Sequence, residues 1–237
     1  MSRQLALPVG LSDHAQFDTF LDAGNAEAGA AMRQLAAGDG PSPVWLCGPR
    51  GSGKSHLLQA ACAAARGAVS YLPLGRLSSH GPGLLEGLER CRLVCIDDVH
   101  AVAGEDAWER ALFALYNALH DAGGALVLAA PRPPGGVGIA LADLASRLAA
   151  ARVYGLQPLD EARLLVALQN RAARRGFDLP DETGRWMLRR LPRDAATLFE
   201  LLDRLDLAAL AAQRRLTVPF VRETLAAVRP DAQDCAD

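Results

Sequence analysis

Residues 48–55 read Gly48-Pro49-Arg50-Gly51-Ser52-Gly53-Lys54-Ser55. They fit the phosphate-loop pattern Gly-x-x-x-x-Gly-Lys-Ser/Thr, and they lie between an apolar run, Val44 to Cys47, and an amphipathic stretch, Ser55 to Arg66. Glycines let backbone N–H groups turn inward around phosphates, and the following helix adds its positive N-terminal end. The alternative is a glycine-rich turn without a ligand, for which chance would have to supply both the pattern and its flanks.

The loop supplies several kinds of contact to a bound nucleotide. Its backbone would surround the phosphates, and Lys54 would reach the outer ones. Ser55 would offer its hydroxyl to Mg²⁺. We therefore assign all eight loop residues, together with the adjoining His56, to the binding of ADP or ATP with Mg²⁺.

A second motif is the run Leu93-Val94-Cys95-Ile96-Asp97-Asp98, an apolar strand that ends in two carboxylates. Asp97 is placed to hold Mg²⁺, and Asp98 to orient or deprotonate an attacking water. An Asp-Asp pair at a strand end is on its own often a solvated turn. Its position downstream of a phosphate loop favours the catalytic interpretation.

Strand-like and helical patterns alternate around these motifs. Strands are expected at Val44 to Cys47, Ala68 to Leu74, Leu93 to Ile96, Ala125 to Ala130 and Val153 to Leu156, and helices at Asp18 to Leu35, Ser55 to Arg66 and Asp106 to Asp121. This alternation predicts an α/β fold with a five-stranded parallel sheet covered by helices on both faces.

The composition changes after the fifth strand. Four amphipathic helical stretches follow, with no further strand: Asp160 to Arg175, Asp181 to Leu191, Asp194 to Arg215 and Val218 to Val228. Asp160 is expected to cap the first of them. We expect an extended tail at 1–12, a nucleotide-binding base at 13–156, a helical lid at 157–229 and a frayed tail at 230–237.

Composition excludes several classes of protein. Half of the 237 residues are hydrophobic and the net charge is −2, which excludes global disorder and argues against a general electrostatic grip on DNA. No apolar run is long enough to cross a membrane, so we expect a cytoplasmic protein. The five cysteines form no C-x-x-C pair, and we expect reduced, buried thiols: Cys47, Cys62, Cys91, Cys95 and Cys235.

Short segments spread over nearly the whole chain carry a resemblance to a known family. They include Gln4-Leu5-Ala6-Leu7-Pro8-Val9, Phe17-Asp18-Thr19-Phe20, Leu115-Tyr116-Asn117, Asp143-Leu144-Ala145-Ser146-Arg147-Leu148, Leu156-Gln157-Pro158-Leu159, Arg174-Arg175-Gly176-Phe177-Asp178-Leu179-Pro180 and Leu216-Thr217-Val218-Pro219-Phe220-Val221. With the phosphate loop and the Asp97-Asp98 strand, they resemble the AAA+ module of the replication initiator DnaA. The resemblance is closer to the DnaA-related Hda family of regulatory inactivators.

The resemblance implies a function. A member of this family, bound to nucleotide and to the DNA-loaded sliding clamp of DNA polymerase III, promotes hydrolysis of the ATP on DnaA and so represses replication initiation. DNA would be contacted only indirectly, through the clamp. No membrane partner is implied, and the assembly state, including a homodimer, stays open.

The same resemblance implies roles for two arginines. Arg147 would project toward the nucleotide of DnaA and stabilise transition-state charge, an effect worth roughly 10³ to 10⁵ in rate in other nucleotide hydrolases. The alternative is a surface helix pair between Asp143 and Arg147. Arg193 occupies the position of the family's second sensor, where an arginine reads the bound nucleotide from the lid.

The N-terminal segment resembles a short clamp-binding peptide. The Gln4 amide would occupy a polar subsite, while Leu5, Leu7 and Pro8 would fill an apolar groove. The alternative is that this segment packs on its own domain as a first strand.

One departure from AAA+ proteins concerns hydrolysis. The fourth strand of such proteins usually ends in a polar residue that positions water, whereas this chain has Leu128-Ala129-Ala130-Pro131. We therefore expect weak intrinsic ATPase activity. Two alternatives are an ATP-driven helicase loader or DNA-remodelling enzyme, which would show a basic groove and a polar strand end, and a small-molecule phosphotransferase.

Overall fold

The computed structural model describes residues 15–191 and 195–227. They belong to two compact units that divide between Pro158 and Leu159, and each is described by itself. Gln4, Leu5, Leu7, Pro8 and Arg193, to which we assigned partner or nucleotide contacts, lie outside the described residues. No helix of the described part is long and apolar enough to cross a membrane.

The first unit is built on a five-stranded sheet in the order β2-β3-β4-β1-β5, and every neighbouring pair runs parallel. The strands are β1 (Val44–Cys47), β2 (Val69–Pro73), β3 (Leu93–Asp97), β4 (Ala125–Ala130) and β5 (Arg152–Gly155). The predicted architecture, a five-stranded parallel α/β domain followed by a helical unit, is confirmed.

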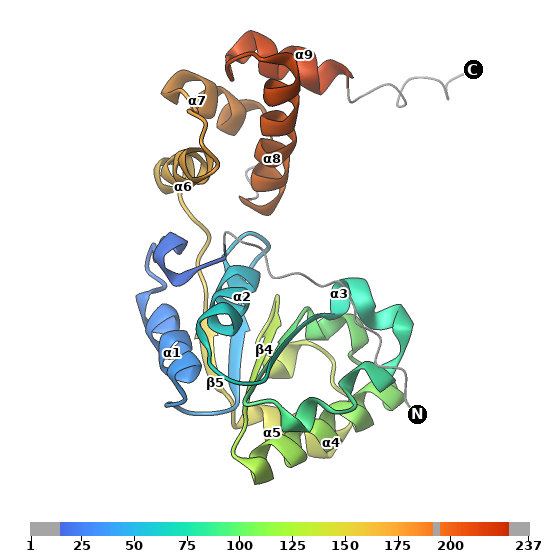
Figure 1. The fold of residues 1–237 in the computed structure, drawn as a ribbon. Coiled ribbons are helices and arrows are strands. Elements are labelled where there is room, and N and C mark those ends of the chain that lie inside the picture. The colour runs from blue at the N-terminus through green and yellow to red at the C-terminus, as the bar shows by residue number, and fades with distance from the viewer. Residues whose placement is uncertain (1–14, 192–194, 228–237) are drawn as a thin grey trace, which may run out of the picture. The chain divides into compact units, whose positions relative to one another are not determined.

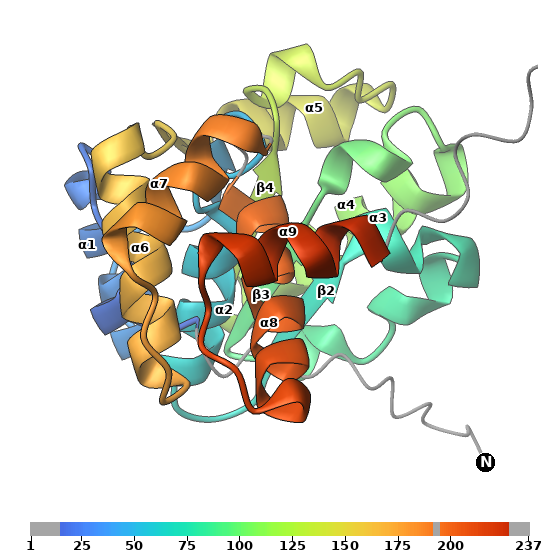
Figure 2. The same cartoon turned by 90° about the horizontal axis from the view of Figure 1, so that it is seen from above.

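Helices cover both faces of this sheet (Figure 1, Figure 2). Helices α1 (Ala26–Ala37) and α2 (Lys54–Ala64) lie on one face, and α4 (Asp106–Ala122) and α5 (Ala142–Ala149) on the other. Successive side chains of a strand point to opposite faces. Val44 and Leu46 of β1 accordingly pack with α1 and α2, whereas Trp45 and Cys47 join the core beneath α4 and α5.

Short elements complete the first unit. Helix α3 (Leu74–Leu77) follows β2, and single 3₁₀ turns lie at Phe17–Thr19, Ser78–His80, Pro82–Leu85, Leu88–Arg90, Val99–Val102 and Pro134–Gly136. The predicted helix over Asp18 to Leu35 is wrong in its first part. Ala23 and Gly24 have φ angles of 39° and 92°, which interrupt a right-handed helix, so α1 begins only after this break.

The second unit is all helical. It contains α6 (Glu161–Arg174), α7 (Asp181–Arg190), α8 (Ala195–Ala212) and α9 (Val218–Ala227). Apolar side chains from all four helices form one core: Leu164, Leu168, Met187, Leu188, Leu198, Leu202, Leu205, Phe220 and Val221. The predicted cap at Asp160 is confirmed, since its carboxylate accepts a 2.8 Å hydrogen bond from the Arg163 N–H.

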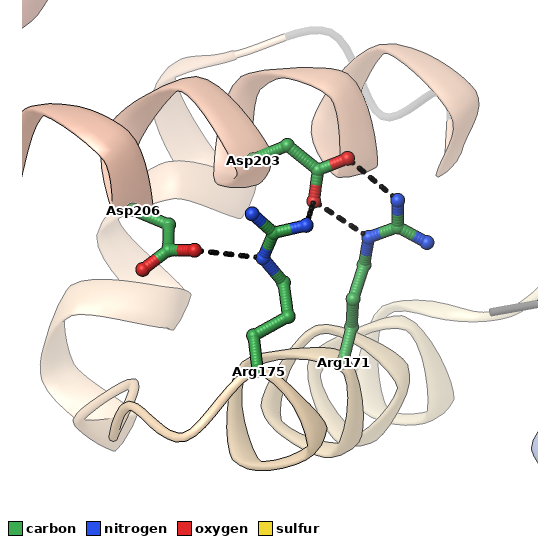
Figure 3. A network of polar contacts seen from close by, with 4 residues as sticks. All are labelled: Arg171, Arg175, Asp203 and Asp206. Atoms are coloured by element: carbon green, nitrogen blue, oxygen red, sulfur yellow. Dashed lines mark hydrogen bonds and ion pairs between the residues drawn. The ribbon is translucent and has the colours of Figure 1, made fainter. Parts of the chain in front are cut away.

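A network of charged side chains joins α6 to α8 beside this core (Figure 3). Arg171 donates two hydrogen bonds to Asp203, at 3.0 and 2.6 Å. Arg175, the residue that directly follows α6, contacts both Asp203, at 3.5 Å, and Asp206, at 2.7 Å. The four side chains are only 18 to 29% exposed, so their attraction is screened less than that of a surface pair.

Candidate nucleotide-binding site

The phosphate loop connects β1 to α2, as predicted, and its shape depends on glycine. Gly48 and Gly53 have φ angles of 147° and 96°, in the region that favours glycine. A Cβ at Gly48 would collide with the carbonyl oxygen of Leu156, and one at Gly53 would lie 2.9 Å from the ring of Phe20. The backbone therefore turns where no larger residue fits.

Two polar side chains of the loop are buried. The Lys54 ammonium donates to the carbonyl oxygens of Gly48, at 2.8 Å, and Pro49, at 2.9 Å, and the residue is 8% exposed. Burial lowers the pKa of Lys54, while the charges of Asp97 and Asp98 act in the opposite direction. The Ser52 hydroxyl oxygen is buried and has no hydrogen-bond partner among the described residues.

Asp97 ends β3 and is only 2% exposed. Its Oδ2 accepts a 3.0 Å hydrogen bond from the Tyr71 hydroxyl, and its Oδ1 accepts one of 3.0 Å from the Asp98 N–H. Burial raises the pKa of Asp97, while hydrogen bonds from Ser55, Tyr71 and the Asp98 backbone act to lower it. The structure thus brings the Ser55 hydroxyl and the Asp97 carboxylate together.

Asp98 has an unusual backbone conformation. Its φ and ψ angles are 55° and 40°, a left-handed conformation in a residue other than glycine. Its carboxylate lies against Gly75, where an added Cβ would be 2.7 Å from Asp98 Oδ2. Strained backbone of this kind is often found at functional sites.

These residues fit a nucleotide's phosphate chain with a divalent cation. The buried hydroxyl of Ser52 needs a partner, Lys54 supplies a cation whose protein partners are loop carbonyls, and the glycines allow close approach of the backbone. A hydroxyl and a carboxylate, from Ser55 and Asp97, are the hard oxygen ligands that Mg²⁺ prefers.

The end of β4 lies between the two motifs, because β4 pairs with β3 on one side and β1 on the other. Ala129 and Ala130 form this end, and both are fully buried. The strand that is central to the site therefore offers no polar side chain at this point.

His56, assigned above to the nucleotide, contacts the segment that precedes α1. Its Nε2 lies 2.8 Å from the Gln16 carbonyl oxygen and 3.2 Å from the Thr19 hydroxyl, and its ring is 5.7 Å from that of Phe20. The start of α2 is thus tied to the start of the described chain.

Arg147 is exposed on α5. The alternative interpretation, a surface pair with Asp143, would need an ion pair that the structure does not contain between these two described residues. The guanidinium instead lies over the ring of Tyr116, with 5.9 Å between its central carbon and the ring centroid.

Two family descriptions match adjacent parts of the chain. Residues 84–157 match the family described as bacterial DnaA ATPase domain, and residues 160–225 match the one described as Hda, lid domain. The chain is an Hda-like, DnaA-related AAA+ protein. The first match includes Asp97, Asp98 and Arg147, and it begins downstream of the phosphate loop.

Solved structures with the same fold are similar to this Hda-like chain at low sequence identity. Domain III of DnaA from Thermotoga maritima has a TM-score of 0.77 and 21% identity, and the match covers 94% of this chain and all of that one. AMPPCP-bound DnaA from Aquifex aeolicus gives 0.70 and 20%, with coverages of 92% and 71%. A mutant of RuvB from Thermotoga maritima gives 0.67 and 19%, with 92% and 73%.

Sequence reasoning missed Tyr71 of the Hda-like chain. The tyrosine lies on β2 in register with Cys95 of β3, two residues before the position that pairs with Asp97. Burial and the neighbouring Asp97 charge raise the pKa of the phenol, so it remains a hydrogen-bond donor at neutral pH. Only the pairing of β2 with β3 reveals this contact, because a single sequence does not fix which strands are neighbours.

Proposed function

We propose that this protein binds ADP or ATP with Mg²⁺ at the phosphate loop and, together with the DNA-loaded sliding clamp, stimulates hydrolysis of the ATP bound to DnaA. It would thereby act as a negative regulator of replication initiation. The observation that carries this proposal is the match of residues 160–225 to the Hda lid, directly after a part that matches the DnaA ATPase domain. The AMPPCP-bound DnaA of similar fold supports the choice of ligand.

In the nucleotide site, each residue has a role that its chemistry supports. Backbone N–H groups of the loop and the Ser52 hydroxyl would bind phosphate oxygens, and Lys54, which contacts the carbonyls of Gly48 and Pro49 in the structure, would bind the outer phosphates. Ser55 and Asp97 hold the cation. Mg²⁺, when bound, would neutralise phosphate charge. Asp98 would orient water, and the resemblance assigns to Arg193 a contact with the nucleotide.

The protein's own hydrolysis is slow under this proposal. With Ala129 and Ala130 at the end of β4, no side chain there can hold a water in line with the phosphate. Such a protein can keep nucleotide as a structural ligand. The hydrolysis that matters would then take place on DnaA.

Arg147 is the residue that would act on DnaA. It is exposed and forms no ion pair with a carboxylate of residues 15–191 or 195–227, so its charge is available to a neighbouring molecule. Its stacking on Tyr116 limits the conformations of the side chain, which lowers the entropy lost when it contacts a phosphate. The DnaA partner is reached through this face, and the clamp through residues 4–8.

The test mixes ATP-bound DnaA with DNA-loaded clamp, ADP and this protein, and measures the rate of ADP formation on DnaA. Arg147→Ala should bind nucleotide and clamp normally but lose stimulation by a factor of at least 10², toward the range known for arginine fingers. Arg110→Ala is the matched control, because Arg110 is an exposed arginine on α4 that pairs with Asp106.

Two results would contradict the proposal. If Arg147→Ala stimulates hydrolysis on DnaA as strongly as the parent protein does, the proposed action of Arg147 on DnaA is wrong. Sustained multiple-turnover hydrolysis by the isolated protein would instead support a helicase loader or DNA-remodelling enzyme.

A further inference from the structure

A chain of hydrogen bonds crosses from α2 through β2 to the end of β3. The Gln59 amide donates to the Tyr71 hydroxyl at 3.2 Å, and the Tyr71 hydroxyl donates to Asp97 Oδ2 at 3.0 Å. A phenol has a single proton to donate. Because that proton is directed at the carboxylate, the Gln59 amide must be the donor in the other bond, and the direction of the whole chain is fixed.

The two oxygens of Asp97 are held from different sides. The Asp98 N–H fixes Oδ1 at 3.0 Å, and Tyr71 fixes Oδ2. A backbone donor alone would leave the carboxylate free to rotate about χ2, since this torsion is broad for aspartate. The Ser55 and Tyr71 hydroxyls restrict that rotation, and of these two donors Tyr71 is the one that is not itself assigned to the cation.

The hydroxyl of Tyr71 is separable from the packing of its ring. The ring packs with the partly buried side chains beside the core under α1 and α2. A phenylalanine would fill the same volume there, so the apolar contacts require no oxygen. What the oxygen adds is the bond to Asp97 and an acceptor for Gln59.

We propose that Tyr71 is a positioning residue that orients the Asp97 carboxylate for the divalent cation bound with nucleotide, and that Gln59 in turn orients Tyr71. This inference rests on the proposed nucleotide binding. Mg²⁺ requires near-ideal octahedral geometry, so the direction of each ligand oxygen affects its affinity. Outer hydrogen bonds to metal ligands typically change metal affinity by about 10- to 100-fold.

The test compares nucleotide affinity with and without the metal. A fluorescent ADP analogue is titrated into the full-length protein in excess Mg²⁺ and again in EDTA, and the ratio of the two dissociation constants measures the contribution of Mg²⁺. Tyr71→Phe should reduce this ratio about 10- to 100-fold and leave the affinity in EDTA within about twofold of the parent. An unchanged ratio in a folded Tyr71→Phe protein overturns the proposal.

Two further variants separate positioning from folding. Gln59→Leu leaves Tyr71 in place and should reduce the ratio in the same direction by a smaller factor. In an Asp97→Asn background, Tyr71→Phe should have little further effect, because the carboxylate that it orients is gone. A full, independent effect of Tyr71→Phe in that background would contradict the proposal, as would an unchanged ratio in Gln59→Leu if Tyr71→Phe does not fold.

The parent protein distinguishes this inference from the proposed function. Nucleotide binding without any Mg²⁺ effect would overturn the role of Tyr71 and leave stimulation of DnaA to be judged by its own assay. An absence of nucleotide binding in the parent would overturn both.

Discussion

Ser52 and Ser55 are two hydroxyls in one loop with opposite surroundings. Ser55 is exposed and hydrogen-bonded to Asp97, whereas the Ser52 oxygen is buried and has no partner in the part of the chain that the structure describes. Burial of an unpaired hydroxyl costs about 1 to 3 kcal/mol. The Ser52 hydroxyl therefore lowers the stability of the fold. A hydrogen bond from this hydroxyl to a phosphate oxygen of bound nucleotide would offset that cost.

Replacing Ser52 by alanine should separate stability from binding. We expect Ser52→Ala to keep or raise the free energy of unfolding, by up to about 1 kcal/mol, because the unpaired hydroxyl is removed. Nucleotide affinity should fall about tenfold with the loss of one hydrogen bond to a charged group. Urea denaturation and an ADP titration measure the two quantities. A variant that is destabilised by more than about 1 kcal/mol would show that Ser52 has a structural partner.

Sequence alone located the phosphate loop and Asp97-Asp98, because each is a local pattern whose chemistry depends on neighbours in the chain. It did not locate Tyr71, whose contact with Asp97 depends on which strands pair. Nor did it indicate the left-handed backbone at Asp98, since aspartate more often adopts other conformations. The assigned roles of Arg147 and Arg193 stay predictions.

Glu109 of α4 holds together three segments of the first unit. The residue is 1% exposed, and its carboxylate accepts hydrogen bonds from the N–H groups of Gly104, at 2.7 Å, Ala140, at 3.0 Å, and Leu141, at 2.6 Å. Leu141 precedes the first turn of α5. One side chain thus fixes the start of the helix that carries Arg147.

The stabilisation by Glu109 should depend on pH. Burial acts to raise the pKa of Glu109, but the three backbone donors together outweigh it and hold the pKa below its ordinary value. The contribution is fully present above the unfolded pKa of about 4.3 and is lost as the pH falls through the lower folded value. Glu109→Gln should cost about 1 to 3 kcal/mol at pH 7, with the difference from the parent shrinking below pH 4.

The control for this variant is Glu105→Gln. Glu105 is exposed just before α4, and its side chain makes no capping hydrogen bond. The same change of charge should therefore alter stability by less than about 0.5 kcal/mol. Denaturation curves at pH 7 and pH 3.5 for the three proteins decide the matter, and a pH-independent loss in Glu109→Gln would refute the ionic explanation.

The pattern of apolar residues predicted most elements, with ends that shift by one to three residues. Buried parallel strands are short apolar runs, and each lid helix has an apolar face. Both patterns are visible in the sequence because the side chains that form them are buried. The early helix failed because its mixed pattern spans Ala23 and Gly24, where the backbone takes positive φ values. Positive φ values at two successive residues end a helix even where the spacing of apolar residues is helical.

Under the proposed function, the protein contacts two other proteins, DnaA and the sliding clamp. Residues 4–8 are the predicted contact with the clamp. Replacing Gln4 and Leu5 by alanine should lower clamp affinity by about 10²-fold or more, since two or three side chains carry most of the energy in a small peptide-in-groove contact. The melting temperature should not change. Clamp binding is measured by surface plasmon resonance.

Ser2→Ala is the control for that double variant, because Ser2 lies in the same tail but outside the docking peptide. If the tail instead packs on the protein, the double variant should lose stability and keep its clamp affinity. Full burial of Leu5 would contribute roughly 1.5 to 3 kcal/mol. That combination of results would eliminate the docking role.

The charged network of the lid has a consequence for how this unit can evolve. Apolar contacts between α6 and α8 are non-directional, so Leu168 and Leu202 tolerate exchange for other apolar residues of similar volume. The carboxylates of Asp203 and Asp206 are matched to Arg171 and Arg175 in position and in sign. Loss of one partner leaves a partly buried charge unpaired, and this lowers the stability of the lid. Substitutions between apolar residues should therefore accumulate freely in the core of the lid. A substitution at one of the two acids or two arginines should persist only together with a matching substitution at its partner.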